Sequence, residues 1–161
     1  MTAPIPPQVL LKGFDERGFV FYTNYTSRKG QELEATPRAA LVFWWEPLQK
    51  SVRVEGTVER VPESESDEYF ASRPRGSRIG ALVSPQSTAL PGGRAELEAR
   101  AVALEEEYAD ESVPVPRPSH WGGYLVRPQR VEFWQGRPSR LHDRLVYQRR
   151  AEEWVVTRLA P

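Results

Sequence analysis

Hydrophobic and polar positions alternate along the first part of the chain as they do in β strands. In residues 51–60, Val52, Val54 and Val58 alternate with charged or polar side chains, which predicts a strand with one buried and one solvated face. Residues 39–46 ("AALVFWWE") are apolar at consecutive positions instead. Such a pattern is expected of a central strand, or of a strand packed against a partner subunit.

The same criteria predict further strands and four helices. The strands fall at 8–14, 19–24, 124–128, 130–136, 144–150 and 153–161, and the helices at 27–37, 62–74, 77–84 and 93–111. Ser27 and Ser77 are the expected N-caps of the first and third helices. One apolar stripe runs along the longest helix, made of Leu97, Ala101, Leu104 and Tyr108. Short antiparallel strands with inserted helices predict a mainly β fold, a small barrel in a single domain.

Composition narrows the class of protein. The 161 residues have a formal net charge of +0, so bulk attraction to nucleic acid or to an anionic membrane is not expected. The sequence has no cysteine, which excludes disulfides and thiolate chemistry. No apolar run approaches the roughly 20 residues of a membrane span, and the N-terminus lacks the pattern of a signal peptide. We therefore expect a soluble, cytoplasmic protein.

Two stretches place cations where an anion could bind. Arg28 and Lys29 lie in the first turn of a predicted helix, where positive charge opposes the helix dipole unless an anion is present. Tyr69 and Arg73 share a helix face, and Ser77 follows in the next turn, so that their polar groups can converge on a second small anion. The alternative for each stretch is a solvated surface with exposed bases.

The third stretch is "WQGRPSRLHDR", residues 134–144. Read as a strand, it turns Arg140, His142 and Arg144 to one side, where like charges repel unless something negative lies between them. A cationic neighbourhood disfavours imidazolium, so His142 is expected to stay neutral unless Asp143 or a bound anion compensates. A solvated turn, an anionic substrate and a nucleic-acid patch all remain open here, whereas a metal site is not expected.

Taken together and in order, these stretches resemble the pyridoxamine 5′-phosphate oxidase family. The match runs over nearly the whole chain, through "FYTNYTSRKG", "WEPL", "VRVEG", "SPQS", "WGGY" and "EFWQGRPSRLHDR" to the terminal "RLAP". The resemblance implies one FMN-binding split β-barrel domain over residues 1–161, with residues 119–161 as a dimerisation and active-site region. It implies a homodimer with FMN at the interface, oxidising pyridoxine or pyridoxamine 5′-phosphate to pyridoxal 5′-phosphate with oxygen as acceptor.

The resemblance also assigns residues to roles. Those expected to contact FMN are Tyr22, Thr23, Arg28, Lys29, Gln86, Ser87, Trp134 and Arg144. Those expected to bind the substrate phosphate are Lys12, Tyr69, Arg73 and Ser77. Arg140 and His142 are expected to lie against the substrate ring and orient the reacting carbon, and an obligatory base role for His142 is not implied.

The chain departs from the family pattern at its start. The family usually has a further N-terminal helix and strand, and two flavin-contacting positions, an arginine and a glutamine, fall here on Pro7 and Ser51. A shortened or misassigned start and a natural variant with weak flavin binding are both compatible with this. Two other functions also stay open, namely a related flavin oxidase of phenazine-type biosynthesis and a non-catalytic module that binds flavin or pyridoxal phosphate.

Overall fold

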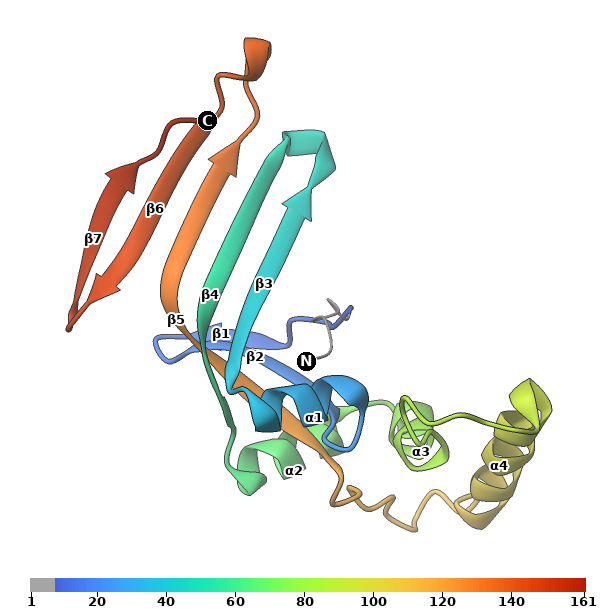
Figure 1. The fold of residues 1–161 in the computed structure, drawn as a ribbon. Coiled ribbons are helices and arrows are strands. Elements are labelled where there is room, and N and C mark those ends of the chain that lie inside the picture. The colour runs from blue at the N-terminus through green and yellow to red at the C-terminus, as the bar shows by residue number, and fades with distance from the viewer. Residues whose placement is uncertain (1–7) are drawn as a thin grey trace.

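The computed structural model describes residues 8–161, whose strands form one curled antiparallel sheet with helices at one end (Figure 1). The strands are β1 (Gly13–Asp15), β2 (Gly18–Asn24), β3 (Arg38–Trp45), β4 (Lys50–Arg60), β5 (Trp121–Gln135), β6 (Asp143–Arg150) and β7 (Glu153–Arg158). Their order is β1-β2-β5-β4-β3, with β6 beside β5 and β7 beside β6. Because β1 and β2 run across the lower ends of β3–β5 in Figure 1, the sheet is curled. The predicted mainly β architecture is confirmed.

β5 is the longest strand and organises the sheet. Its first half lies between β2 and β4, and its second half lies between β4 and β6. The sequence predicted two strands here, with a break at Pro128, but the strand runs through. Pro128 lacks an amide hydrogen, and it lies at a register shift between Glu55 and Gly56 of β4. Gly56 is required there, because a Cβ atom would lie 1.9 Å from the carbonyl oxygen of Arg127.

β3 is an edge strand among the described residues, so the central-strand interpretation of residues 39–46 is wrong. It pairs with β4 alone. Ala39 and Leu41 pack against the main core, whereas Val42 and Trp44 remain 67% and 51% exposed. The physical reason for the misreading is that an apolar face can be covered by a partner as well as by a neighbouring strand. That second interpretation remains a prediction.

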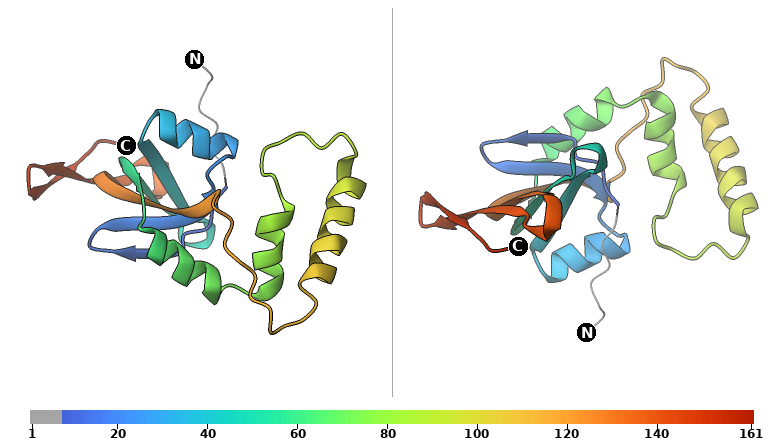
Figure 2. Two further views of the ribbon diagram at one scale, coloured as in Figure 1. Left: turned by 90° about the horizontal axis from the view of Figure 1, so that it is seen from below. Right: turned by 90° about the horizontal axis from the view of Figure 1, so that it is seen from above.

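In the described part of the chain four α-helices accompany the sheet, and Figure 2 shows that α3 and α4 form a hairpin to one side of it. They are α1 (Arg28–Ala35), α2 (Glu63–Ser72), α3 (Arg75–Val83) and α4 (Gly93–Glu107). Short 3-10 turns occur at Glu46–Leu48 and Pro138–Arg140. Ser27 is the N-cap of α1, as predicted, and its hydroxyl accepts from the amide of Gly30. Ser77 is not a cap, because Pro74 is the N-cap of α3 and the helix begins two residues before Ser77.

Three hydrophobic clusters hold the described residues together. The main core lies on one face of β2 and β5 and contains Phe21, Tyr25, Val58, Tyr124 and Val126. A smaller cluster of Val20, Val61 and Leu125 lies on the opposite face. The third joins the helical hairpin, where the predicted stripe of α4 packs against Ile79, Val83 and Val115. Within residues 8–161, no helix is both long enough and apolar enough to cross a membrane.

Candidate active site

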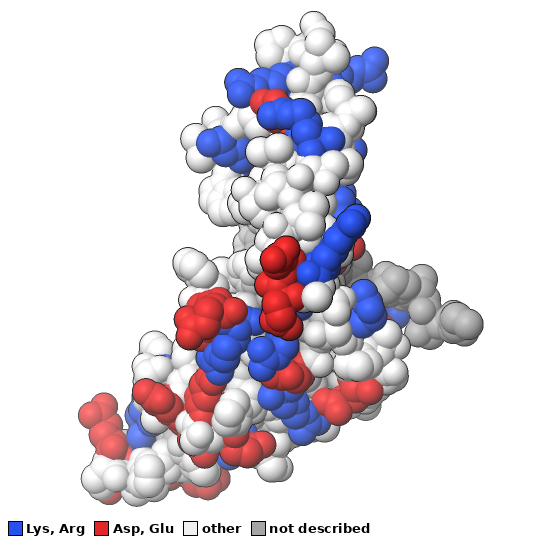
Figure 3. Space-filling model, turned by 90° about the vertical axis from the view of Figure 1, so that its left-hand side faces the viewer, with Lys and Arg blue, Asp and Glu red and all other residues white. Residues whose placement is uncertain are grey.

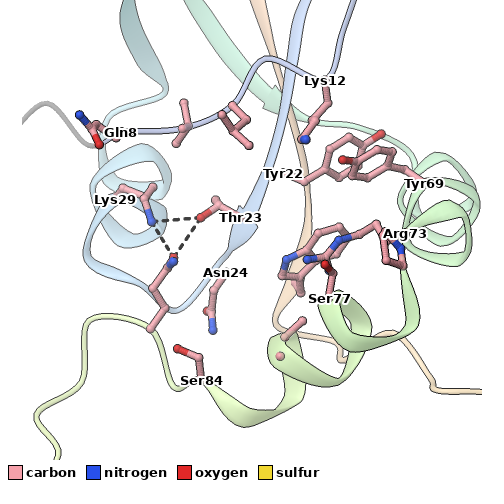
Figure 4. A pocket seen from close by; sticks show the side chains of 17 residues that line it. Gln8, Lys12, Tyr22, Thr23, Asn24, Lys29, Tyr69, Arg73, Ser77 and Ser84 are labelled. Atoms are coloured by element: carbon pink, nitrogen blue, oxygen red, sulfur yellow. Dashed lines mark hydrogen bonds between the residues drawn. The ribbon is translucent and has the colours of Figure 1, made fainter. Parts of the chain in front are cut away.

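A pocket of about 740 Å³ opens where β2, the first residue of β5, α2, α3 and the segment before β1 meet (Figure 4). Its volume lies within the range of small-molecule sites, roughly 300–1,000 Å³. Eight residues to which the sequence assigned roles line it together: Lys12, Tyr22, Thr23, Lys29, Tyr69, Arg73, Ser77 and Gln86. They come from segments up to 74 positions apart, so the fold brings together groups that only the sequence resemblance had connected.

The pocket wall carries positive charge without a counter-ion. Lys12, Lys29 and Arg73 line it, while no aspartate or glutamate does. None of the three forms an ion pair with any residue of the described part of the chain. Burial lowers the pKa of Lys29 and of Arg73, because it disfavours their charged forms. A concave surface with cations and no carboxylate is suited to an anionic ligand.

Lys29 lies on one side of the pocket and is held by neutral oxygens (Figure 4). Its Nζ donates to Gln86 Oε1 at 2.6 Å, to Thr23 Oγ1 at 3.1 Å and to Ser27 Oγ at 3.3 Å. These partners fix the position of the ammonium group without neutralising it. Lys29 is therefore a donor without a counter-ion among the described residues, held at the start of α1, where the helix dipole also favours an anion.

Arg73 lies on the other side, beside a stack of aromatic rings (Figure 4). Its guanidinium carbon is 4.7 Å from the centroid of the Trp121 ring, and its Nη1 is buried with no hydrogen-bond partner among the described residues. Tyr22 and Tyr69 stack at 3.9 Å between ring centroids, and burial raises the pKa of Tyr22 to about 12. A buried donor without a partner is costly, so Nη1 is poised for an acceptor supplied by a ligand.

The other residues assigned from the sequence lie elsewhere. Arg28 does not line the pocket, and its Nε donates to Glu32 across one helical turn. Ser87 lies outside the lining set too. Four more lie at the far end of the sheet: Trp134, Arg140, His142 and Arg144. Trp121 and Trp134 are 13 positions apart on the same strand, roughly 40 Å along it. Within one chain, the two groups of residues therefore do not meet.

The far group, Trp134, Arg140, His142 and Arg144, is arranged differently from the predicted strand. Pro138–Arg140 is a turn in which Ser139 and Arg140 have φ of 58° and 61°, so Arg140 and His142 do not share a strand face. The Pro-Ser sequence starts a turn that the alternation argument overlooked. His142 packs against Trp134 at 4.7 Å between ring centroids, and its Nδ1 accepts from the backbone amide of Arg137 at 3.1 Å.

Of the three bases predicted to lie together, only Arg144 receives an acidic partner from the protein itself among the described residues. Glu132, only 2% exposed, accepts from Arg144 Nε at 2.8 Å and from Arg130 Nη2 at 2.8 Å. Hydrogen bonds from Arg144 and then from Arg130 hold the pKa of Glu132 below its usual value. Asp143 does not pair with His142, because its two oxygens accept from Arg137 and Arg158.

Sequence reasoning missed several residues of the two groups. Trp121, which supports Arg73, occurs in the "WGGY" motif but received no role. Glu132 was detectable as an acid within an otherwise apolar strand pattern, the usual sign of a paired buried charge. Asn24 and Ser84, which also line the pocket, carried no signal in the sequence. Of the two departures from the family pattern, Pro7 lies outside the described residues, and Ser51 pairs across the sheet with Trp134.

These residues can be tested as a site for FMN and a second phosphorylated ligand. Lys29 on one side and Lys12 with Arg73 on the other are the cations without counter-ions, and the unpartnered Nη1 of Arg73 fits a phosphate oxygen. The aromatic rings between them offer flat apolar surfaces to a ring system. The donor set therefore fits two anionic groups joined to planar rings.

Comparison with known proteins agrees with this geometry. Residues 4–108 match the family described as pyridoxamine 5′-phosphate oxidase, and residues 121–161 match its pyridoxine 5′-phosphate oxidase C-terminal dimerisation region. A pyridoxine/pyridoxamine 5′-phosphate oxidase of Salinibacter ruber is 61% identical over 155 residues, which cover 95% of this chain and 71% of that protein. One of Rubrobacter xylanophilus is 59% identical over 158 residues, covering 98% and 71%.

Two solved structures share the fold. PhzG from Burkholderia lata, crystallised with tetrahydrophenazine-1-carboxylic acid, superposes with a TM-score of 0.87 at 33% identity, covering 95% of this chain and 73% of that one. A pyridoxamine 5′-phosphate oxidase-related, FMN-binding protein of Nostoc punctiforme gives a TM-score of 0.73 at 15% identity, covering 95% and 79%. By its matched regions and its relatives, the chain belongs to the pyridoxamine 5′-phosphate oxidase family.

Proposed function

We propose that the chain is an FMN-dependent oxidase that converts pyridoxine or pyridoxamine 5′-phosphate to pyridoxal 5′-phosphate. The single observation that carries the proposal is the pocket whose wall holds Lys12, Lys29 and Arg73 and no carboxylate. Two phosphorylated ligands, the flavin and the substrate, would use these cations. Relatives at 56–61% identity that bear this activity in their names support the same assignment.

The oxidation balances with oxygen as the final acceptor. The alcohol substrate loses two electrons and two protons from its 4′ carbon and hydroxyl, and oxygen takes them up as hydrogen peroxide. The amine substrate loses the same electrons and protons, and water then replaces nitrogen, which leaves as ammonia. Bound FMN would supply the redox chemistry by accepting a hydride from the substrate carbon.

The protein would contribute binding and orientation. Lys12, Arg73, Tyr69 and Ser77 would hold the substrate phosphate, which fixes the ring and raises the effective concentration of its reacting carbon. Lys29 with Thr23 and Gln86 would hold the flavin on the opposite side of the pocket, with Arg28, Tyr22 and Ser87 as further assigned contacts. No side chain of this pocket needs to form a covalent bond to substrate.

The far group would act on the pocket of a second copy. Trp134 lies about 40 Å along β5 from Trp121 at the pocket, and Arg140, His142 and Arg144 follow in the turn after β5 and at the start of β6. In a twofold dimer, the end of one sheet can reach the pocket of its partner, and each chain then contributes to both sites. The match of residues 121–161 to a dimerisation region supports this arrangement.

A phenazine-type oxidase is the second candidate, favoured by the structural likeness to PhzG. The likeness is weaker in sequence, at 33% against 61% for an oxidase of pyridoxine phosphate. The two cations on the substrate side, Lys12 and Arg73, also favour a doubly charged phosphate over a single carboxylate.

A visible absorbance spectrum tests the proposal. The purified protein is mixed with FMN, freed of excess flavin and oxygen, and then given pyridoxine 5′-phosphate. We expect the band of bound flavin to bleach on addition of substrate, and peroxide to appear with pyridoxal 5′-phosphate when air is admitted. A bound flavin that stays oxidised would favour a binding module, and no flavin binding at all would overturn the proposal.

A further inference from the structure

A second, smaller cavity lies beside the pocket. This side cavity has a volume of about 220 Å³ and is formed by the β1–β2 hairpin together with α2. Lys12, Tyr22 and Tyr69 line both the side cavity and the pocket, and Figure 4 shows Lys12 next to the two tyrosine rings. The ammonium group of Lys12 can therefore be attracted by charged groups on either side of this shared wall.

The side cavity differs from the pocket because it contains carboxylates. Asp15 and Glu65 line it, whereas no acid lines the pocket. Glu65 is the less exposed of the two acids, so solvent screens its charge less. Burial, and then the negative charge of Glu65, raises the pKa of Tyr22, so this charge acts on the shared wall. A lysine drawn toward these acids would be lost to a phosphate in the pocket.

Arg17 occupies both carboxylates instead of Lys12. Its Nη2 and Nε donate to Asp15 Oδ2 at 2.7 Å and 3.0 Å, and its Nη1 donates to Glu65 Oε2 at 2.9 Å. The guanidinium group carries its donors in a rigid fork, so it can bind two carboxylates at once. Lys12 forms no ion pair with any residue of the described part of the chain.

We propose that Arg17 is a positioning residue, which keeps Lys12 available for the substrate phosphate by neutralising Asp15 and Glu65. This inference rests on the proposed function, in which Lys12 and Arg73 hold that phosphate. Arg17 itself does not line the pocket, so it acts through Lys12. Without Arg17, the unpaired carboxylates of the side cavity would compete with the phosphate for the ammonium group.

A purely structural role is the alternative, because the ion pair between Arg17 and Glu65 also joins the β1–β2 hairpin to α2. Two variants separate these roles. Arg17→Gln removes the cation and leaves Glu65 free to attract Lys12. Glu65→Gln breaks the same ion pair but also removes the competing carboxylate, so Lys12 stays available. A structural tie would be lost in both variants, whereas competition for Lys12 arises only in the first.

Calorimetric titration of the FMN-loaded protein with pyridoxal 5′-phosphate and with pyridoxal measures the effect. The two ligands share the ring and the aldehyde, so the ratio of their dissociation constants reports on the phosphate. We expect Arg17→Gln to raise the constant for pyridoxal 5′-phosphate about fivefold, the scale of a partly exposed ion pair, and to leave that for pyridoxal unchanged. Glu65→Gln alone, and added to Arg17→Gln, should give a ratio close to the native one.

Several outcomes would overturn the proposal. Equal losses in Arg17→Gln and Glu65→Gln would show a structural tie, and equal constants for the two ligands in the native protein would show that no phosphate is held. If Arg17→Gln does not fold, Glu65→Gln alone decides, because a weakened preference for the phosphorylated ligand would again indicate a tie and a native preference would exclude one.

The Lys12→Met background tests whether Arg17 acts through Lys12. Without the ammonium group, Arg17→Gln has nothing to divert and should leave the binding of pyridoxal 5′-phosphate unchanged, whereas a fivefold loss in this background too would contradict the proposal. Arg100→Met is the matched control. It breaks an ion pair on α4 whose acid, Glu96, is 28% exposed, as Glu65 is, and it should leave the binding of both ligands unchanged.

Binding measured without turnover keeps this inference apart from the proposed function. A protein whose variants bind as expected, but which oxidises neither pyridoxine nor pyridoxamine 5′-phosphate, would count against the proposed function alone. Oxidation of these substrates, with the same constant for pyridoxal 5′-phosphate in Arg17→Gln as in the native protein, would count against this inference alone.

Discussion

At the scale of single residues, the pocket differs from the rest of the molecule because its cationic side chains have no carboxylate partners. Elsewhere most arginines have a carboxylate partner, and the mixed charges on the lower half of the face in Figure 3 reflect these pairs. Lys12, Lys29 and Arg73 have none among the described residues. Uncompensated charge destabilises a folded protein, so such residues are expected where a ligand supplies the opposite charge.

Arg73→Ala should weaken the binding of substrate far more than the binding of FMN. Its unpartnered Nη1 lies on the substrate side of the pocket, and loss of one charged hydrogen bond corresponds to about a ten- to hundredfold change in affinity. Fluorescence titration with FMN and with pyridoxal 5′-phosphate measures both constants. Arg75→Ala is the matched control, because Arg75 binds backbone carbonyls outside the pocket. Equal losses for both ligands would contradict two separate anion sites.

Lys29→Met should abolish tight FMN binding without lowering the unfolding free energy of the ligand-free protein. Burial lowers the pKa of Lys29, so the unfolded chain keeps this proton to higher pH than the folded chain does. Between the two pKa values the stability of the native protein therefore rises with pH, and any advantage of the methionine variant should shrink there. Urea unfolding from neutral to alkaline pH measures this. A large loss of stability at neutral pH would show that the lysine is structural.

At the scale of elements, β5 carries both parts of the proposed function. Its first residue, Trp121, supports Arg73, and its second half holds Glu132 and Trp134. The alternating pattern predicted the strands on either side of Pro128, but joining them depended on β4, whose register shift accommodates the proline. The sequence pattern also failed to predict the turn at 138–140, because residue types can alternate by chance outside strands.

Glu132→Gln should destabilise the junction of β5 and β6. The change leaves Arg130 and Arg144 without their carboxylate, and breaking a buried ion pair costs up to about 3 kcal/mol when the arginines are partly exposed. The pKa of Glu132 is lowered in the folded state, so its contribution is present above the unfolded pKa and is lost as the pH falls through the folded pKa. Unfolding curves of both proteins should therefore converge in acid. A difference that persists at low pH would contradict this account.

At the scale of the whole molecule, the exposed apolar residues and the two distant groups of site residues point to the same arrangement. Val42 and Trp44, 67% and 51% exposed, lie on one face of the sheet, whereas Phe133 and Val156, 45% and 51% exposed, lie on the other. The upper part of the face in Figure 3 is mainly uncharged, with several basic and a few acidic atoms among the white ones. Exposed apolar side chains such as Val42 and Trp44 are typical of an interface, and a partner on their face would also bring His142 to a second pocket.

Val42→Glu should yield a monomer that no longer retains FMN. The side chain is 67% exposed in the single chain, so a carboxylate there disturbs no core but would be buried in a dimer. Light scattering after gel filtration gives the mass, and the visible spectrum gives the flavin content. Val102→Glu on α4, 53% exposed and away from the sheet, should leave both unchanged. A Val42→Glu dimer with normal flavin would exclude β3 from the interface.

Mixing two impaired variants should raise the activity above that of either variant alone. If Lys29→Met removes the pocket and His142→Leu removes the far group, a mixed dimer has one intact site. Random exchange of subunits would give roughly a quarter of the native activity. No recovery, with mixed dimers confirmed by mass, would show that each site is built within one chain.

The sequence by itself determined most of the elements, because hydrophobic periodicity and capping are local. The cap at Ser27, the stripe of α4 and the strand at 51–60 follow from neighbouring residues alone. Its ordered motifs also identified the family and the residues that line the pocket. The sequence did not reveal which side chains face each other. Their arrangement depends on contacts between residues that are far apart in the chain.

Only the tertiary structure decided how the charges are paired. It showed that Arg28 binds Glu32 and that Glu132 holds Arg144, whereas Arg73 has an unpartnered nitrogen. It also separated the pocket from His142 by most of the length of β5, and set a backbone amide against Nδ1 of that histidine. Ion pairs and hydrogen bonds depend on distances and directions within a few ångströms, and the order of residues alone does not specify these.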